Sequence, residues 1–447
     1  MTLRTRRLLF YTLVFLFLIT GLGAVLYSQG WRLDIENCQA KEVWVAIRMG
    51  AFGLPEPAGG GALFGCIQKT GAIFLKTKPK EVTIKIGGKT FEDKSGLITG
   101  GTLIPDLLPK TYRAEIIKEG YYSWAKNLSV KPELVAEAAN IVLIPKEVKK
   151  EVISIPRLRG DRIASWNEGN NEFILRDSQK DIYYLYDLEK IQGVFNVNLN
   201  FRNLKGDGAV IKKLSFHPFD PSELIVETEK GLDVLDTLRL NLESILKTKP
   251  LIWTAKGNNL YYITSDSLYS FNLIVKTRTL VTQLATSSVS QSPIVKLETS
   301  ESQNWLAFLD NSGNLYTLNQ TGKNLQKIGH NVADFAFSPD NKKIAYLDKN
   351  QKLNISFLED WLSDSHKKAG ELTQFRLEKQ ALALKWYSDS AHLLLVYPDE
   401  LKFTEIDDRE PTNTYSLFKD IGGNFHYSSK SDSIYFLEKE NLVRASI

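Results

Sequence analysis

The chain has 447 residues, of which 43% are hydrophobic and 24% are charged. That composition is typical of a globular protein, and the length allows about three domains. The formal net charge is only +4, from 56 Lys and Arg against 52 Asp and Glu, which argues against a dedicated nucleic-acid-binding protein. Aromatic residues reach 11%, while Cys and Met number 2 each. This profile favours β-structure and excludes both a disulfide framework and a four-cysteine metal site.

An apolar segment near the N-terminus predicts a membrane helix. Residues Leu8–Tyr27 carry no charged side chain, and Arg4, Arg6 and Arg7 precede them. At about 1.5 Å per residue, a helix of this length spans the roughly 30 Å hydrocarbon core of a bilayer. Because arginines hold their end of such a helix in the cytoplasm, residues 1–7 are expected there. The rest of a single-pass protein would then be extracytoplasmic, at the cell surface or in a periplasm-like space.

Two other interpretations of this segment stay open, a cleaved signal peptide and a buried core helix. The apolar stretch of a signal peptide is about 7–15 residues long and ends in small residues at the cleavage site. Here a longer stretch ends in Val25-Leu26-Tyr27. A core helix usually has a polar face. We therefore expect a retained helix that contacts the lipid bilayer through Leu8–Tyr27, with Trp31 and Arg32 at the interface.

Residues 28–69 are predicted to be a linker or an insertion. The stretch FGLPEPAGGGALFG (52–65) is rich in Gly, Pro and Ala and lacks strand alternation. Cys38 and Cys66 lie on either side of it. In an oxidising exterior the two could pair, or they could remain free thiols, and the sequence leaves both possibilities open.

Short segments of alternating apolar and polar residues fill residues 70–146. Pro, Gly or charged turns separate them, a pattern that predicts a small antiparallel β-sandwich. The predicted strands are GAIFLKTKP (71–79), VTIKI (82–86), LITGGTLI (97–104), TYRAEIIKE (111–119), YSWAKNLSV (122–130) and NIVLIP (140–145).

This region resembles the PEGA domain, named for a Pro-Glu-Gly-Ala turn. The resemblance lies in IFLKTKPKEVTIKIGGK (73–89) and LLPKTYRAEIIKEGYYSW (107–124), where Tyr112 and Gly120-Tyr121 occupy the characteristic places. It covers nearly the whole of residues 70–146 and implies an extracytoplasmic β-module that binds or spaces and is not an enzyme.

Two departures from the PEGA pattern concern its turns. The turn itself reads Pro79-Lys80-Glu81-Val82, and Lys110 follows Pro109 where glycine is usual. Both changes affect the turn signature, while the strand pattern on either side is retained.

Residues 150–447 contain a repeat whose length matches the ~40–45 residues of a four-stranded propeller blade. In each copy a marker residue, usually aromatic, precedes the start of an apolar strand by about seven positions. The marker and strand-start pairs are Trp166/Phe173, Phe216/Leu224, Trp253/Leu260, Thr299/Leu306, Phe337/Ile344, Trp386/Leu393 and Tyr427/Ile434. The repeat predicts a β-propeller of seven blades, or of six if the Thr299 copy is misread.

One blade cannot bury both of its faces, so the repeats are expected to close into a ring. The last copy, at Ile447, is one strand short, and VISIPRL (152–158) is the predicted donor of the missing outer strand. Single copies resemble TolB-like and Trp-Asp-repeat propellers. FSPDNKKIAYL (337–347) carries the full signature, and SFHPFDPSELIV (215–226) and WYSDSAHLLLV (386–396) are looser copies. The resemblance implies a structural turn at Pro339-Asp340.

The sequence predicts no catalytic, metal or cofactor-binding residue. It has no Gly-x-Ser-x-Gly elbow, phosphate loop or dinucleotide fingerprint. DNSGN (310–314) is expected to form a hairpin turn and not a calcium loop. None of the histidines has a second histidine at a metal-ligand spacing, and those beside marker turns are expected to be structural. The histidines are His217, His330, His366, His392 and His426, of which the first and the last two lie beside markers.

Three classes of function fit these patterns. The favoured one is an anchored protein of the cell envelope whose propeller binds a protein or a polymer such as polysaccharide or peptidoglycan, with the PEGA-like module as spacer. A structural surface-layer component is the second. The third is a glycan hydrolase or lyase that uses a pair of carboxylates in the propeller. We expect no enzymatic activity, no nucleic-acid partner and no small-molecule cofactor, and the binding residues are not predictable from the sequence.

Overall fold

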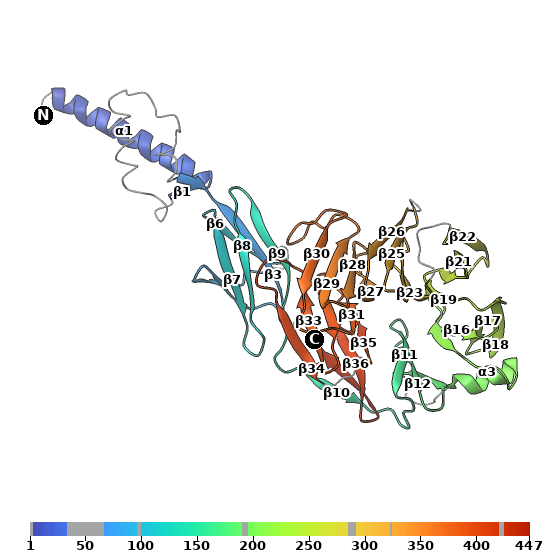
Figure 1. Ribbon diagram of the computed structural model, residues 1–447. Helices are drawn as coiled ribbons and strands as arrows, with labels where there is room; N and C mark the ends of the chain where they lie inside the picture. The colour runs from blue at the N-terminus through green and yellow to red at the C-terminus, as the bar shows by residue number, and fades with distance from the viewer. Residues whose placement is uncertain are drawn as a thin grey trace. The chain divides into compact units, whose positions relative to one another are not determined.

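The computed structural model describes residues 3–33, 67–95, 100–189, 195–284, 292–321, 324–419 and 424–447 (Figure 1). Cys38, Cys66 and the stretch 52–65 lie outside these ranges, so their predicted roles stay predictions. The protein is mainly β and divides into two compact units. Unit 1 comprises Met1–Leu143, Leu362–Ser365 and Arg409–Pro411, and unit 2 comprises Ile144–Trp361, His366–Asp408 and Thr412–Ile447.

Unit 1 begins with the helix α1, Leu3–Ser28. Within Arg4–Ser28 an 18-residue stretch has a mean hydropathy of 2.4, and none of that stretch is buried. The helix is therefore long and apolar enough to cross a membrane or to serve as a signal anchor, whereas its orientation stays a prediction. The three arginines expected before the helix lie in its first turns.

A short strand pair follows α1 in unit 1. β1 (Trp31–Leu33) pairs antiparallel with β2 (Ile67–Lys69). The Arg32 guanidinium lies 3.7 Å from the centre of the Tyr27 ring and 2.9 Å from the Asp106 carboxylate. The two described ends of the predicted linker are thus joined by backbone pairing.

Two sheets form the rest of unit 1 and share one core. Their strand orders are β6-β3-β9 and β5-β4-β7-β8. Buried side chains from both sheets, including Ile73, Ile84 and Trp124, pack together, as a β-sandwich requires. The strands are β3 (Gly71–Lys78), β4 (Thr83–Ile86), β5 (Lys89–Glu92), β6 (Thr102–Leu107), β7 (Thr111–Ile117), β8 (Trp124–Ser129) and β9 (Val135–Val142).

The sandwich differs from the prediction in one pairing and one strand. β3 and β9 run parallel, with Ala72 opposite Val135 and Lys78 opposite Val142, so the expectation of a purely antiparallel sandwich is wrong here. Strands that pair in parallel need a long crossover, and the chain from β4 to β8 provides it. β5 was not predicted because its four residues follow β4 across a tight Gly87-Gly88 turn.

Unit 2 is built from consecutive four-stranded antiparallel sheets, as the repeat predicts (Figure 1). Seven such sheets occur between β10 and β37 in the described part of the chain. The strands of the first four are β11 (Arg162–Asn167), β12 (Glu172–Asp177), β13 (Ile182–Asp187), β14 (Phe195–Asn196), β15 (Lys213–Phe216), β16 (Glu223–Thr228), β17 (Gly231–Asp236), β18 (Asn241–Leu246), β19 (Ile252–Lys256), β20 (Asn259–Ile263), β21 (Ser267–Asn272), β22 (Arg278–Gln283), β23 (Ile294–Thr299), β24 (Trp305–Asp310), β25 (Leu315–Asn319) and β26 (Asn324–Gly329).

The remaining sheets complete the propeller. Their strands are β27 (Val332–Phe337), β28 (Lys343–Asp348), β29 (Lys352–Phe357), β30 (Leu372–Arg376), β31 (Ala383–Trp386), β32 (His392–Val396), β33 (Glu400–Glu405), β34 (Thr414–Lys419), β35 (Phe425–Ser428), β36 (Ser433–Glu438), β37 (Asn441–Ser446) and β10 (Lys150–Ile153). The last sheet has the order β10-β37-β36-β35, with Val152 opposite Val443. The predicted strand donor is therefore confirmed, although β10 is shorter than 152–158 and begins two residues earlier.

The sequence markers correspond to a specific cross-strand position. Six of the seven marker and strand-start pairs lie directly opposite each other at the hairpin between the first and second strands of a sheet. The exception is Trp253, which lies opposite Tyr262, while Ala255 lies opposite Leu260. In that sheet Gly257, at φ +52°, allows a tight two-residue turn, so the true marker position is two residues later.

One helix of unit 2 was not predicted. α3 (Val197–Lys205) follows β14 and buries Phe201 in a core that also contains Ile174 and Leu224. The Asn196 side chain accepts a hydrogen bond from the Leu199 N–H, which caps the helix. The side chains between the sheets form a series of such clusters, so each sheet depends on its neighbours for burial.

Candidate binding site in the propeller

A cavity of about 650 Å³ lies among the first strands of four sheets, β19, β23, β27 and β31. These strands are neighbours in pairs, as β19 contacts β23, β23 contacts β27 and β27 contacts β31. The volume is within the ~300–1,000 Å³ range of ligand pockets. We call it the inner-strand cavity, and its charged lining residues are Lys256, Lys296, Lys385, Glu298, Glu301 and Asp334.

Most charges in the inner-strand cavity are paired with one another. The Lys296 ammonium lies 2.7 Å from an Asp334 oxygen and 2.9 Å from a Glu298 oxygen. Burial alone would lower the pKa of Lys296, but these two carboxylates outweigh it and raise the pKa. Lys256 and Glu301 form a second ion pair. The cavity therefore holds a preformed polar network that belongs to no single strand.

Lys385 differs from the other cations of the cavity. Its ammonium donates a hydrogen bond of 2.7 Å to the Phe425 carbonyl. Among the described residues, no carboxylate comes within ion-pair distance of it. Burial, followed by the positive charge of Lys296, lowers the pKa of Lys385 to about 8, although Asp334 and Glu298 act in the opposite direction.

The contact between Lys385 and Phe425 recurs in unit 2. A first-strand lysine donates to the backbone carbonyl of an aromatic residue about 40 positions later, on the first strand of the next sheet, and its ammonium lies over that ring. We call this arrangement a lysine clasp. The clasps are Lys213 to Trp253 (2.9 Å to the oxygen, 4.4 Å to the ring centre), Lys296 to Phe335 (2.6 and 4.7 Å) and Lys385 to Phe425 (2.7 and 4.4 Å).

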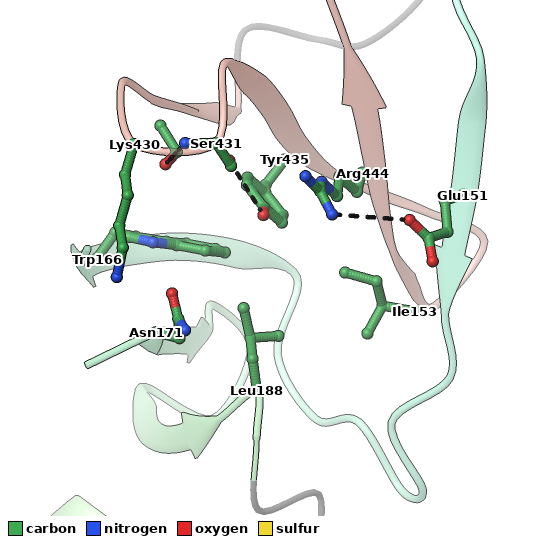
Figure 2. A pocket seen from close by; sticks show the side chains of 10 residues that line it. Glu151, Ile153, Trp166, Asn171, Leu188, Lys430, Ser431, Tyr435 and Arg444 are labelled. Carbon is green, nitrogen blue, oxygen red and sulfur yellow. Dashed lines mark hydrogen bonds and ion pairs between the residues drawn. The ribbon is translucent and has the colours of Figure 1, made fainter. Parts of the chain in front are cut away.

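A second pocket, of about 380 Å³, lies where β10 closes the ring, and we call it the closure pocket. Figure 2 shows Tyr435 and Arg444 between Trp166 on one side and Glu151 on the other. The Tyr435 ring centre is 4.5 Å from that of Trp166, and the Arg444 guanidinium is 3.9 Å from the Glu151 carboxylate. The Tyr435 ring thus joins the last sheet to Trp166 of the first sheet, and the Arg444–Glu151 pair joins β37 to β10 within the last sheet. The pocket lining is therefore part of the ring closure.

The histidines beside the markers make structural contacts, as expected. His392 lies 2.6 Å from the Asp389 carboxylate and stacks on Phe403. The His426 ring stacks on Trp166, with ring centres 4.8 Å apart, and burial lowers the pKa of His426. His217 is buried, and burial lowers its pKa as well.

The segment DNSGN forms the hairpin turn that the sequence predicts. In DNSGN (310–314) the Asp310 carboxylate accepts hydrogen bonds from the Asn314 backbone and side chain, which closes the hairpin between β24 and β25. Within the described ranges, no group of three or more His, Cys, Asp or Glu side chains is arranged to hold a metal ion.

Sequence reasoning named no binding residue, and the inner-strand cavity shows why. Lys296, Asp334 and Lys385 belong to three different sheets and are brought together only when neighbouring sheets stack. A signal does exist, because a lysine precedes three of the markers on the first strand. Lys213 and Lys296 lie three residues before Phe216 and Thr299, and Lys385 lies directly before Trp386.

One protein family matches part of the propeller region. Residues 246–435 match the family described as "NUP159/214 beta propeller", which covers less than half of the chain and does not extend to the PEGA-like residues 70–146. No curated protein matches. Similar solved structures include a chain of "Crystal Structure of Mitotic Checkpoint Complex", at 11% identity and TM-score 0.46 over 68% of this chain and 91% of that chain. Another is the Myceliophteria thermophila Cps50 (Swd1) β-propeller domain, at 10% identity and TM-score 0.46 over 67% of this chain and all of that one.

Proposed function

We propose that the chain is a membrane-anchored interaction scaffold of the cell envelope and that its propeller binds a partner protein at the inner-strand cavity. The observation that carries this proposal is the cavity itself, a hollow of about 650 Å³ lined by four separate strands. Mixed apolar and charged linings of this kind suit side chains of a polypeptide. Propellers have few exposed strand edges, so their interaction surfaces concentrate at the channel mouths and loops.

The anchor and the spacer complete the proposal. The length and hydropathy of α1 support a role as membrane anchor. The β-sandwich of unit 1 fits the spacer role that the PEGA resemblance implies. In the proposed orientation Arg4, Arg6 and Arg7 stay in the cytoplasm, and the β-sandwich of unit 1 and the whole of unit 2 are extracytoplasmic.

We also propose that the chain is not an enzyme. A glycosidase needs one carboxyl group that holds a proton beside a second that is ionised. In the inner-strand cavity, Glu298 and Asp334 both bind the same Lys296 ammonium. Because each of these carboxylates contacts a charged ammonium, neither has the apolar surroundings that a general acid requires.

Site-specific photo-crosslinking in native cells tests the scaffold proposal. A benzoylphenylalanine placed at Thr254, inside the cavity, is expected to yield an adduct with one discrete protein. The control position is Leu238, which is 80% exposed on a turn of unit 2 and should yield none. A polysaccharide or peptidoglycan adduct would favour the polymer-binding alternative. The proposal fails if Thr254 yields no adduct or the same adducts as Leu238.

A further inference from the structure

We infer that the inner-strand cavity receives a carboxylate from an acidic peptide segment of the partner and that the Lys385 ammonium is the group that binds it. This inference rests on the proposed function and specifies the chemistry of the partner. It starts from the difference between the two buried lysines of the cavity. Lys296 has two carboxylates of the protein itself, whereas Lys385 has one carbonyl oxygen.

An ammonium held among protein atoms without a carboxylate in direct contact is an unfavourable arrangement. It loses hydration, and a single carbonyl replaces only one of its three possible hydrogen bonds. Such a group is usually neutralised or paired. Lys385 lines an open cavity, so a ligand can supply the missing anion. The charged Lys385 thus lowers the stability of the free protein, and a bound carboxylate would remove this destabilisation.

The protonation state of Lys385 suits this role at neutral pH. With a pKa of about 8, the amine is mostly protonated at pH 7 and loses its charge only above that range. A carboxylate beside it would favour the charged form. The titratable groups that act on it or lie beside it are Lys296 and Glu298 from β23, Asp334 from β27 and His426 from β35.

The charges around Lys385 restrict the kind of anion. Lys296 and Lys385 balance Glu298 and Asp334, so the cluster is neutral before a ligand enters. One added negative charge can pair with the Lys385 ammonium. The second charge of a phosphate would find no further cation and would be repelled by the two carboxylates. A single carboxylate therefore fits better than a phosphate group.

The apolar lining favours an amino-acid side chain as the carrier of this carboxylate. Leu384 and Trp386 flank Lys385 on β31, and Ala336 and Phe337 line the cavity from β27. These surfaces can pack against the methylene groups and backbone of a peptide. A sugar carboxylate, which is surrounded by hydroxyl groups, would leave hydroxyls against apolar walls without partners.

A purely structural role for Lys385 is the competing explanation, because it also forms a clasp. Lys213 provides a matched control. It makes the same two contacts with Trp253, and the protein atoms around its ammonium lower its pKa too. Lys213 does not line the inner-strand cavity. Any effect that comes from the clasp alone should appear in both lysines.

Peptide binding to the full chain in lipid nanodiscs tests the inference. The probes are N-acetyl-pentaglutamate and N-acetyl-pentaglutamine, and calorimetry measures the binding of each. We expect the wild type to bind only pentaglutamate. Lys385→Met should weaken that binding by at least about tenfold, whereas Lys213→Met should not change it. Affinity should also fall between pH 7 and pH 9.5 as Lys385 loses its proton.

A measurement on the unsubstituted chain covers the case in which Lys385→Met does not fold. Trace acetylation followed by peptide mass spectrometry reports the reactivity of each lysine. Pentaglutamate should protect Lys385 and leave Lys213 unchanged. Equal binding of the two peptides, absence of binding to either, or equal protection of the two lysines would overturn the inference. Binding of polygalacturonate in place of pentaglutamate would also overturn it, in favour of an acidic polysaccharide.

The photo-crosslinking experiment separates this inference from the function on which it rests. In cells that carry Lys385→Met, the Thr254 adduct should be lost while the Lys213→Met chain retains it. If both variants retain the adduct, the scaffold proposal stands and the role of Lys385 is wrong. If the wild type gives no adduct at all, the scaffold proposal itself falls.

Discussion

Three lysines of unit 2 make the same clasp, yet their electrostatic surroundings differ. Lys296 is surrounded by acceptors and its pKa is raised, whereas burial lowers the pKa of Lys213 and Lys385. Because the geometry is shared, the clasp alone does not determine the free-energy cost of burying the charged ammonium. That cost depends on whether a carboxylate lies within ion-pair distance of the ammonium, as Glu298 and Asp334 do for Lys296.

Lys385→Met is expected to stabilise the protein at pH 7. The folded-state pKa of about 8 lies below the ordinary value of 10.5, so the unfolded chain binds more protons between these values. Stability of the wild type should therefore rise with pH from about 8 to 10.5, and below pH 8 the full cost of the charged amine is present. Methionine removes that cost. The expected rise in the unfolding midpoint, about 2 °C or more at pH 7, should shrink towards pH 10.5.

The comparison variant for this measurement is Lys296→Met, which should shift the midpoint the other way. It leaves Glu298 and Asp334 without their shared cation, which costs about 2–3 kcal/mol. Scanning fluorimetry of the tryptophans can follow both variants. If the unfolding midpoint of Lys385→Met falls at pH 7, the clasp contacts stabilise the protein by more than the buried charge destabilises it.

At the scale of elements, the pairing of β10 with β37 is the contact that completes the last sheet. β10 has only four residues, and Val152 is 60% exposed, so its side chains add little burial. The backbone ladder and the closure pocket therefore provide most of its attachment. Loss of this strand would leave β37 as an open edge.

Replacement of Glu151 and Val152 by proline tests this pairing. Successive strand residues point their N–H groups in opposite directions, so the double substitution must remove one ladder bond whichever residue donates it. We expect hydrogen exchange of β37 to accelerate strongly while that of β33 changes little. The control replaces the same two residues by alanine and should keep most of the protection. Unchanged exchange of β37 in the proline variant would show that β10 is dispensable.

The elements also show how far sequence reasoning reaches. Phe337 and Ile344, seven positions apart, lie directly opposite each other because the length of their hairpin places them there. Trp253 and Leu260 have the same spacing but do not lie opposite each other, because Gly257 allows a shorter turn, which no hydrophobic pattern records. α3 was missed because it is only nine residues long and its stabilisation comes from Phe201 in a core shared with other elements, a tertiary effect.

The candidate site was beyond sequence reasoning for a different reason. Its residues are about 40–50 positions apart, and their neighbourhood depends on how the sheets close into a ring. A lysine among apolar residues on a first strand is visible in the sequence, but its partner is not. The register between sheets decides whether that lysine meets Asp334 or a carbonyl alone.

For the whole molecule, the orientation of α1 determines where the propeller acts. The test uses Leu238→Cys, a highly exposed position of unit 2, in a chain whose Cys38 and Cys66 are replaced by serine. A membrane-impermeant maleimide added to intact cells is expected to label Cys at position 238, because arginines retain the N-terminus of the anchor inside. Lysed cells provide the control for reactivity. Labelling that requires lysis would reverse the proposed orientation.

The closing strand pair has a consequence for the order in which the molecule is made. β10 emerges from the ribosome directly after the sandwich, but its partner β37 emerges almost 300 residues later, since Lys150 pairs with Ala445. Until then β10 has an unpaired edge, and the sheets made in between can stack without completing the ring. Closure must therefore be a late event in biogenesis. If the chain is exported while it is being synthesised, the propeller becomes whole only after β37 has crossed the membrane.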